Sequence, residues 1–139
     1  LAVALVSFLV ISCFIKLPIF NFYLMIFYLV FSCCFLGLMG ILCGIISDGF
    51  DQMSAVTSYL ITPLTFLSGT FYSIESLPKF WQNIAHFNPF FQMIDGFRYS
   101  ITGHCDGNLL MGAIYILAIN LVMMIFIYRL LKIGYRIKS

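Results

Sequence analysis

The chain has 139 residues, of which 63% are hydrophobic and 9% charged, and its seven basic and five acidic residues give a net charge of +2. Soluble domains carry about 25% charged residues, so this composition and a mean hydropathy of +1.07 exclude a soluble globule and indicate a bilayer protein. Without a basic stripe to hold phosphates, nucleic acid is excluded as a partner. The five cysteines show no CxxC spacing and four lie in apolar runs, which favours packing over redox or metal chemistry.

The first apolar run covers residues 1–15 and ends at Lys16, Leu17 and Pro18. Fifteen residues are fewer than the roughly 20 that a helix needs to cross the hydrocarbon. We therefore expect the beginning of this span to be missing and the chain to be part of something larger. A signal peptide is the alternative, but no basic residue precedes the run and no small-residue cleavage site follows it.

A second span is predicted over residues 22–47, which hold no charge and are long enough to cross. Within it Gly37, Gly40, Gly44 and Ser47 recur at spacings of three and four, so these small residues share one face. Such a stripe allows close approach of another helix, from this chain or from a second copy. The alternative is that glycines are simply common in membrane helices.

Two carboxylates, Asp48 and Asp51, then interrupt the apolar sequence. Each would cost about 2.5 to 3.5 kcal/mol at the bilayer centre, so we expect a turn at the surface here. A third span is predicted over residues 53–74, as a helix from residue 53 to residue 71 or 74. Pro63 removes a backbone donor in its middle and should kink or interrupt it, which would let the helix bend around a pathway.

Residues 75–107 mix aromatic and charged side chains, as is typical of the water–lipid boundary. We call this segment the cap and expect two short amphipathic helices in it, neither long enough to span. Pro78 suits the first turn of the first helix. Its apolar face is then formed by Phe80, Trp81, Ile84 and Phe87.

Asn88 is suited to cap the second short helix, with Pro89 at its first position. The residues expected to face apolar surroundings are Phe90, Phe91, Ile94, Phe97 and Ile101. Asp95 and Arg98 stand at i and i+3, where they are expected to form an ion pair. A structural pair at a wet boundary is favoured here over a proton relay.

The loop after this helix contains His104, Cys105 and Asp106 in a row, and three adjacent ligands cannot all close on one ion without strain. A metal site is therefore disfavoured. His86 and His104 lack a companion carboxylate at a catalytic spacing, so neither is expected to be a catalyst.

The last span is predicted over residues 109–128, interrupted only by Asn120, which is expected to hydrogen-bond between helices. Four cations follow it: Arg129, Lys132, Arg136 and Lys138. By the positive-inside rule the C-terminus is cytoplasmic. Counting back through four crossings places the turn at 48–51 inside and the cap outside. The sequence thus predicts one transmembrane domain over residues 1–139, an all-α bundle of four spans with two short extracytoplasmic helices.

The spaced series from Pro63 to Tyr72, Leu77–Pro78, Trp81–Gln82, Asn88–Pro89 and Ile94 to Arg98 resembles the signature of the ABC-2 type permeases, the membrane subunits of ATP-binding-cassette exporters. The resemblance implies a six-helix subunit in a plasma or inner membrane that dimerises with a second permease copy and works with two ATP-binding subunits. The four spans would be the third to the sixth. The family's initial amphipathic helix and first two spans are not in the sequence.

The resemblance further implies outward movement of a drug-like, lipid or lipid-linked glycan substrate, with ATP and Mg²⁺ bound by the partner subunit. No cofactor is expected on this chain, and it has no GxxxxGK[ST] run to hold phosphates. The chain is accordingly not expected to be an enzyme. The family-motif residues expected at the substrate exit are Pro63, Gly69, Phe71, Tyr72, Pro78, Trp81, Asn88, Pro89, Asp95 and Arg98.

Two other classes remain open from the sequence. A small non-transporting membrane protein would scaffold or regulate an assembly, with the aromatic cap as a docking surface. An intramembrane enzyme is less favoured, because it needs catalytic pairs at depth and the ionisable residues here lie at the span edges.

Overall fold

The computed structural model describes residues 20–47, 49–69 and 78–133, together with the isolated helical positions 3, 6, 7, 10 and 14. Asp48 and residues 15–19, 70–77 and 134–139 lie outside the described residues, as does most of the predicted span 1–15. Every element in the described part is helical, which confirms the all-α prediction there. The elements are α2 (Phe22–Ile46), α3 (Phe50–Val56), a π-helical turn η1 (Thr57–Ile61), α4 (Thr62–Phe66), α5 (Lys79–Phe87), α6 (Pro89–Thr102) and α7 (Leu109–Ile133).

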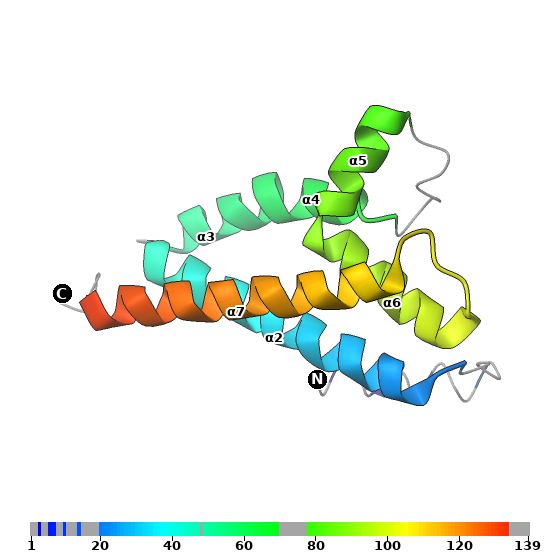
Figure 1. The fold of residues 1–139 in the computed structure, drawn as a ribbon. Coiled ribbons are helices and arrows are strands. Elements are labelled where there is room, and N and C mark those ends of the chain that lie inside the picture. Colours follow the sequence, from blue (N-terminus) through cyan, green and yellow to red (C-terminus); the bar gives the residue numbers. More distant parts are fainter. Residues whose placement is uncertain are drawn as a thin grey trace.

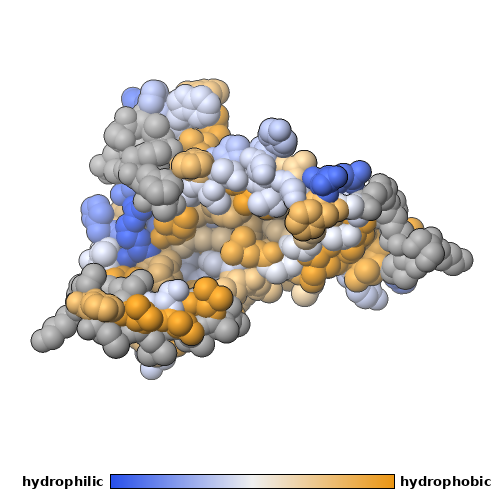
Figure 2. All heavy atoms as spheres, turned by 180° about the vertical axis from the view of Figure 1, so that it is seen from behind, coloured by the Kyte–Doolittle hydropathy of each residue, from blue (hydrophilic) through white to orange (hydrophobic). Residues whose placement is uncertain are grey.

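Two of the described helices, α2 and α7, are long and apolar enough to cross a membrane. Each has 25 residues and a mean hydropathy of 2.5, and at a rise of 1.5 Å per residue each is about 38 Å long. In the most apolar 18-residue stretch of each helix, the share of residues buried inside the structure is 6% for α2 and 22% for α7. The core helix of a soluble protein is mostly buried, whereas apolar side chains cover much of the surface here (Figure 2). Lipid is the solvent that fits this exposure.

The long helices α2 and α7 pack against each other and run in the same direction (Figure 1). The elements α3, η1 and α4, which lie between them in the sequence, run in the opposite direction. The helices α5 and α6 and the loop 103–108 therefore lie at the end where α2 and α7 begin. The opposite end holds the turn before α3 and the end of α7 at Ile133.

The core lies where α2, α6 and α7 meet, and its centre is Tyr28, which is 0% exposed. The ring packs directly on Gly96 of α6: a Cβ built on this glycine would lie 2.1 Å from the ring. The Tyr28 hydroxyl donates a hydrogen bond to the carbonyl of Leu109, the first residue of α7, at 3.1 Å. One side chain thus fixes the positions of two helices. The remaining buried members of this cluster are Phe35, Phe90, Met93 and Ile116.

Asn120 provides a second tie between α7 and α2. Its side-chain amide donates to the carbonyl of Phe31 on α2 at 3.3 Å and to that of Ile116 on its own helix at 2.9 Å. The predicted interhelical hydrogen bond is therefore confirmed. The Asn120 side chain is buried, at 6% exposure, and side-chain hydrogen bonds between membrane helices contribute about 0.6 kcal/mol on average.

The helix that was predicted to run from residue 53 to residue 71 or 74 ends earlier, at Phe66. Residues 67–69 form a turn, and Gly69 has a φ of +73°, a left-handed conformation that stops a helix. The run from Phe50 to Phe66 comprises helical elements of 7, 5 and 5 residues, which together reach only the lower end of the roughly 17 to 25 residues of crossing helices. The interruption expected at Pro63 is present as the π turn before it, where the Thr62 hydroxyl donates to the Thr57 carbonyl at 3.0 Å.

The glycine stripe of α2 faces open space in the described structure. At Gly37, Gly40 and Gly44 a Cβ would meet no atom within 4 Å. No described helix packs on this face, so the packing seam stays a prediction that concerns another chain or segment.

The contrast between the two kinds of glycine gives a stability test. Gly96→Ala would force a methyl group into the Tyr28 ring, and overpacking of this kind costs about 1 to 3 kcal/mol. Gly40→Ala is the matched control: it enters open space and should leave stability equal or raise it by about 0.5 to 1 kcal/mol. Unfolding of the purified protein in detergent measures both, and equal stability of the two variants would contradict the packing described.

Candidate functional site

Asn88 joins the two cap helices to α4. Its side-chain oxygen accepts a hydrogen bond from the Phe90 N–H at 3.0 Å, which makes it the N-cap of α6 with Pro89 at the first position, as predicted. Its side-chain NH₂ donates to the carbonyl of Leu64 at 2.6 Å. Carbonyls in the last turn of a helix lack a partner within that helix. Asn88, which is 3% exposed, therefore provides a hydrogen-bond partner for a backbone N–H at the start of α6 and for a backbone carbonyl near the end of α4.

Asp95 of α6 holds the loop that leads into α7. Its carboxylate is 5% exposed and accepts two backbone hydrogen bonds, from the N–H of Asp106 at 2.9 Å and that of Gly107 at 3.0 Å. Hydrogen bonds to an ionised acceptor are stronger than neutral ones, so they offset the cost of removing the carboxylate from water. A Cβ on Gly107 would approach Asp95 to 3.1 Å, so the loop fits closely around the carboxylate.

Arg98 connects α6 with the turn that follows α4. One terminal nitrogen donates to the Gly69 carbonyl at 2.6 Å, and the other pairs with the Asp106 carboxylate at 3.4 Å. The predicted Asp95–Arg98 ion pair is therefore wrong. The i, i+3 spacing brings the two residues close, but backbone N–H groups of the loop donate to Asp95, and Arg98 donates to the Gly69 carbonyl in the turn after α4.

We call Asn88, Asp95 and Arg98 the polar clamp. Together they bind three segments that are far apart in the sequence: the end of α4, the α5–α6 junction and the loop before α7. Three polar residues of the motif region thus each tie α6 or its N-cap to another segment, and Arg98 does so through Gly69. Pro63 lies exposed on α4, in the same helix as the Leu64 carbonyl.

The motif residues of α5 do not join the clamp. Pro78 precedes α5, and Trp81 is 47% exposed. The apolar face predicted for α5 is exposed and does not join the core. Besides Trp81, it consists of Phe80, Ile84 and Phe87. Phe71 and Tyr72 lie outside the described residues.

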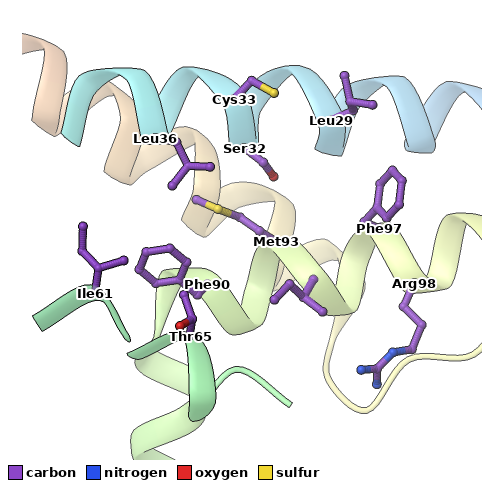
Figure 3. A pocket seen from close by; sticks show the side chains of 11 residues that line it. Leu29, Ser32, Cys33, Leu36, Ile61, Thr65, Phe90, Met93, Phe97 and Arg98 are labelled. Atoms are coloured by element: carbon purple, nitrogen blue, oxygen red, sulfur yellow. The ribbon is translucent and has the colours of Figure 1, made fainter. Parts of the chain in front are cut away.

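A cavity of about 540 Å³ lies between α2, the η1–α4 run and α6. The lining residues are Leu29, Ser32, Cys33 and Leu36 from α2, Ile61 and Thr65 from η1 and α4, and Phe90, Met93, Ile94, Phe97 and Arg98 from α6. Figure 3 shows the α6 side chains Phe90, Met93 and Phe97 between α6 and its neighbours, with Arg98 at one end. The Thr65 hydroxyl donates to the Thr62 carbonyl at 2.7 Å, so it is already satisfied within its own helix. Arg98 is the charged member of an otherwise mainly apolar lining.

The histidine and cysteine of the α6–α7 loop make local contacts. His104 lies 3.9 Å from the Asp106 carboxylate, and the Cys105 thiol donates to the Gly107 carbonyl at 3.1 Å. Partial burial, and then the nearby carboxylates of Asp95 and Asp106, raise the pKa of the Cys105 thiol, which disfavours the reactive thiolate. No group of three metal-binding side chains occurs among the residues for which positions are described.

The family model of the ABC-2 type transporter matches residues 1–102. The chain belongs to this family. It is similar to the inner membrane transport permease YadH of Escherichia coli K12 and of Shigella flexneri, with 45% identity over 78 residues in each case. The alignment covers 56% of this chain and 30% of the permease, so the chain spans under a third of the length of these relatives. No solved structure matches the chain.

Three residues that organise this ABC-2 family chain were not singled out from its sequence. Gly96 was quoted within the motif without a role, Tyr28 was one residue of an apolar span, and Asp106 was considered only for metal binding. A tyrosine hydroxyl within a span is a usable signal, because a buried hydroxyl needs a partner. The partner itself, 81 residues away, has no local signature.

The clamp can be tested at the loop. Asp95→Asn keeps one acceptor but replaces the other with an NH₂ group, which leaves a loop N–H unpaired at a cost of about 1 to 3 kcal/mol. We expect faster hydrogen exchange at the amides of Asp106 and Gly107, measured by mass spectrometry. The control is Asp51→Asn, an exposed position on α3. Unchanged exchange in the loop would show that Asp95 does not hold it.

Proposed function

We propose that this chain belongs to the membrane permease component of an ATP-binding-cassette export system. The observation that supports this most strongly is the family match over residues 1–102. The relatives' description as an inner membrane transport permease and the lipid-suited exposure of α2 and α7 agree with it. The proposed cargo is a drug-like, lipid or lipid-linked glycan molecule that moves outward.

The proposed topology has four crossings in one transmembrane domain, with the C-terminus in the cytoplasm and the cap on the outer side. The parallel direction of α2 and α7 supports it, because both helices would then enter the bilayer from the face that bears the cap. The basic residues at the end of α7, Arg129 and Lys132, support a cytoplasmic location for the other face.

Within this topology the cap would border the substrate exit. The polar clamp supports such a role, since it couples the cap to the end of the helix that contains Pro63. Tilting of that helix would reach the cap through two hydrogen bonds, from Asn88 to Leu64 and from Arg98 to Gly69. The cap would then follow the movement of the helices as one body.

The proposed partners are an ATP-binding subunit, which would hold ATP and Mg²⁺, and a second permease copy. The surface for the ATP-binding subunit would be the turn at residues 48–51, of which the described Asp51 is exposed and lies at the end opposite the cap. The open glycine face of α2 supports contact with a further helix, which the second copy would supply.

The side on which the cap lies can be tested at Lys79, an exposed residue at the start of α5. In a variant whose native cysteines are serines, Lys79→Cys should react with a membrane-impermeant thiol reagent in intact cells. Arg129→Cys, at the other end, should react only after the membrane is opened. The reverse pattern would contradict the proposed orientation.

The transport role can be tested with Arg98→Ala. This change removes a charged hydrogen bond worth about 1.5 to 3 kcal/mol, so export should fall by about tenfold or more if the clamp transmits movement. The measurement is ATP-dependent efflux of an amphipathic dye from cells that express the permease with its ATP-binding subunit. Lys79→Ala, an exposed change on α5, is the control.

Co-purification separates the transport role from a scaffold role. Arg98→Ala should still bring down the ATP-binding subunit, because the changed residue lies at the opposite end from the proposed contact. Normal efflux in a folded Arg98→Ala protein would refute the role of the clamp. If the wild-type chain brings down no ATPase and supports no efflux, the exporter proposal is wrong and a non-transporting scaffold is the better account.

A further inference from the structure

We propose that Tyr115 of α7 and Gln92 of α6 form a latch that sets the direction in which α5 leaves the bundle, so that α5 follows the movements of α7. Both are positioning residues, which act on transport through α5. The consequence for transport rests on the export function proposed above. Neither the family match nor the relatives' names assign a role to these two residues.

Packing alone holds α5 weakly. The helix has nine residues, Lys79–Phe87, and its one buried side chain is the methyl group of Ala85, which lies in a small cluster with Phe91 and Leu67. Isolated helices of this length are marginal in water. Figure 1 shows α5 projecting from the end of the bundle. The clamp residue Asn88 fixes where α5 ends, but one fixed point does not set the direction of a helix.

Two side chains from other helices bind the last carbonyls of α5. The Gln92 side-chain NH₂ donates to the His86 carbonyl at 2.8 Å, and the Tyr115 hydroxyl donates to the Phe87 carbonyl at 2.6 Å. Carbonyls in the last turn have no partner within their own helix. Because the peptide dipoles lie nearly parallel to the helix axis, partners that bind these carbonyls constrain the direction of that axis.

Tyr115 connects α5 to α7. The backbones of these two helices do not pack against each other in the described structure, so a side chain has to join them. Tyr115 lies about 9 Å along α7 from its start at Leu109, at a rise of 1.5 Å per residue. The hydroxyl therefore belongs to the long apolar helix and not to the loop before it. A shift or tilt of α7 would act directly on the end of α5.

Gly112 of α7 makes room for the Gln92 side chain. A Cβ on Gly112 would lie 2.7 Å from the side-chain oxygen of Gln92, whereas the Tyr28 hydroxyl would be at 3.6 Å, an ordinary contact. Gln92 thus lies against α7 while it binds the His86 carbonyl of α5. An alanine methyl group at position 112 would displace the Gln92 amide, which is the flexible end of its side chain, and would leave the core in place.

The test measures the distance between α5 and α7 with nitroxide labels at Lys79→Cys and Leu121→Cys, two exposed positions, in a variant whose native cysteines are serines. The full-length permease is placed in nanodiscs, and pulsed electron paramagnetic resonance gives the distribution of distances. One narrow distance is expected with the native latch. Tyr115→Phe keeps the ring and removes the hydroxyl, so it should raise the population at other distances about threefold to tenfold, as expected for the loss of one hydrogen bond.

A second variant and a control separate the latch from general stability. Gly112→Ala should spread the distances in the same way, while the temperature of unfolding stays equal or rises, because alanine favours the helix. Tyr128→Phe is the matched control: it removes the hydroxyl of an exposed tyrosine in the last part of α7 and should leave the distances unchanged. Thermal unfolding in the same nanodiscs verifies that each variant is folded.

Two results would overturn the latch. One is a broad distribution with the native Tyr115, and the other is a distribution that neither Tyr115→Phe nor Gly112→Ala changes. During turnover with ATP and the ATP-binding subunit, the native distance should stay single because α5 follows α7, and a distance that changes would contradict this.

The consequence for transport has its own readout. Dye efflux by Tyr115→Phe should fall about threefold or more. Normal efflux by this variant, despite spread distances, would overturn the coupling of the latch to transport. A native protein that shows the single distance but no efflux would refute the proposed export function and leave the latch intact.

Discussion

The packing of Tyr28 on Gly96 is the contact on which the rest of the structure depends. It places α6 against α2, and the Tyr28 hydroxyl places the start of α7. Full burial of an aromatic side chain contributes about 1.5 to 3 kcal/mol, and this ring requires a partner without a Cβ at the point of contact. The apolar cavity and the polar clamp both include residues of α6, so both depend on the position that this contact gives to α6.

The motif from Ile94 to Arg98 can now be read as one helical turn with three separate contacts. Successive residues of a helix point in directions about 100° apart, so neighbouring positions serve different elements. Asp95 binds the loop before α7, Gly96 receives Tyr28 of α2, and Arg98 binds the carbonyl of Gly69 after α4. A change in the tilt of any of these elements would therefore act on α6 through these contacts. This is the physical basis on which we propose that the cap follows the helices during transport.

Local rules explain which features were predictable from the sequence. The helical class, the Asn88 cap with Pro89 and the interhelical bond of Asn120 follow from composition or from signals within a few residues. Spacing alone gave the wrong partner for Asp95, because i, i+3 proximity does not exclude a better acceptor or donor on another element. The early helix end was missed because the apolar run continues past Phe66, while the left-handed Gly69 that stops the helix looks like any other glycine in sequence. The Tyr28 contacts depend on residues 68 and 81 positions away, and one sequence has no signal for them.

A double-mutant cycle between Tyr28→Ala and Gly96→Ala tests the central contact most directly. The free energy of unfolding is measured in detergent for the wild type, both single variants and the double variant. Removal of the ring makes room for the added methyl group, so the two changes should not be additive. The double variant is expected to be more stable than the sum of the single effects predicts, by about 0.5 to 3 kcal/mol. Strict additivity would show that Tyr28 does not pack on Gly96, and the arrangement of α2, α6 and α7 described above would be wrong.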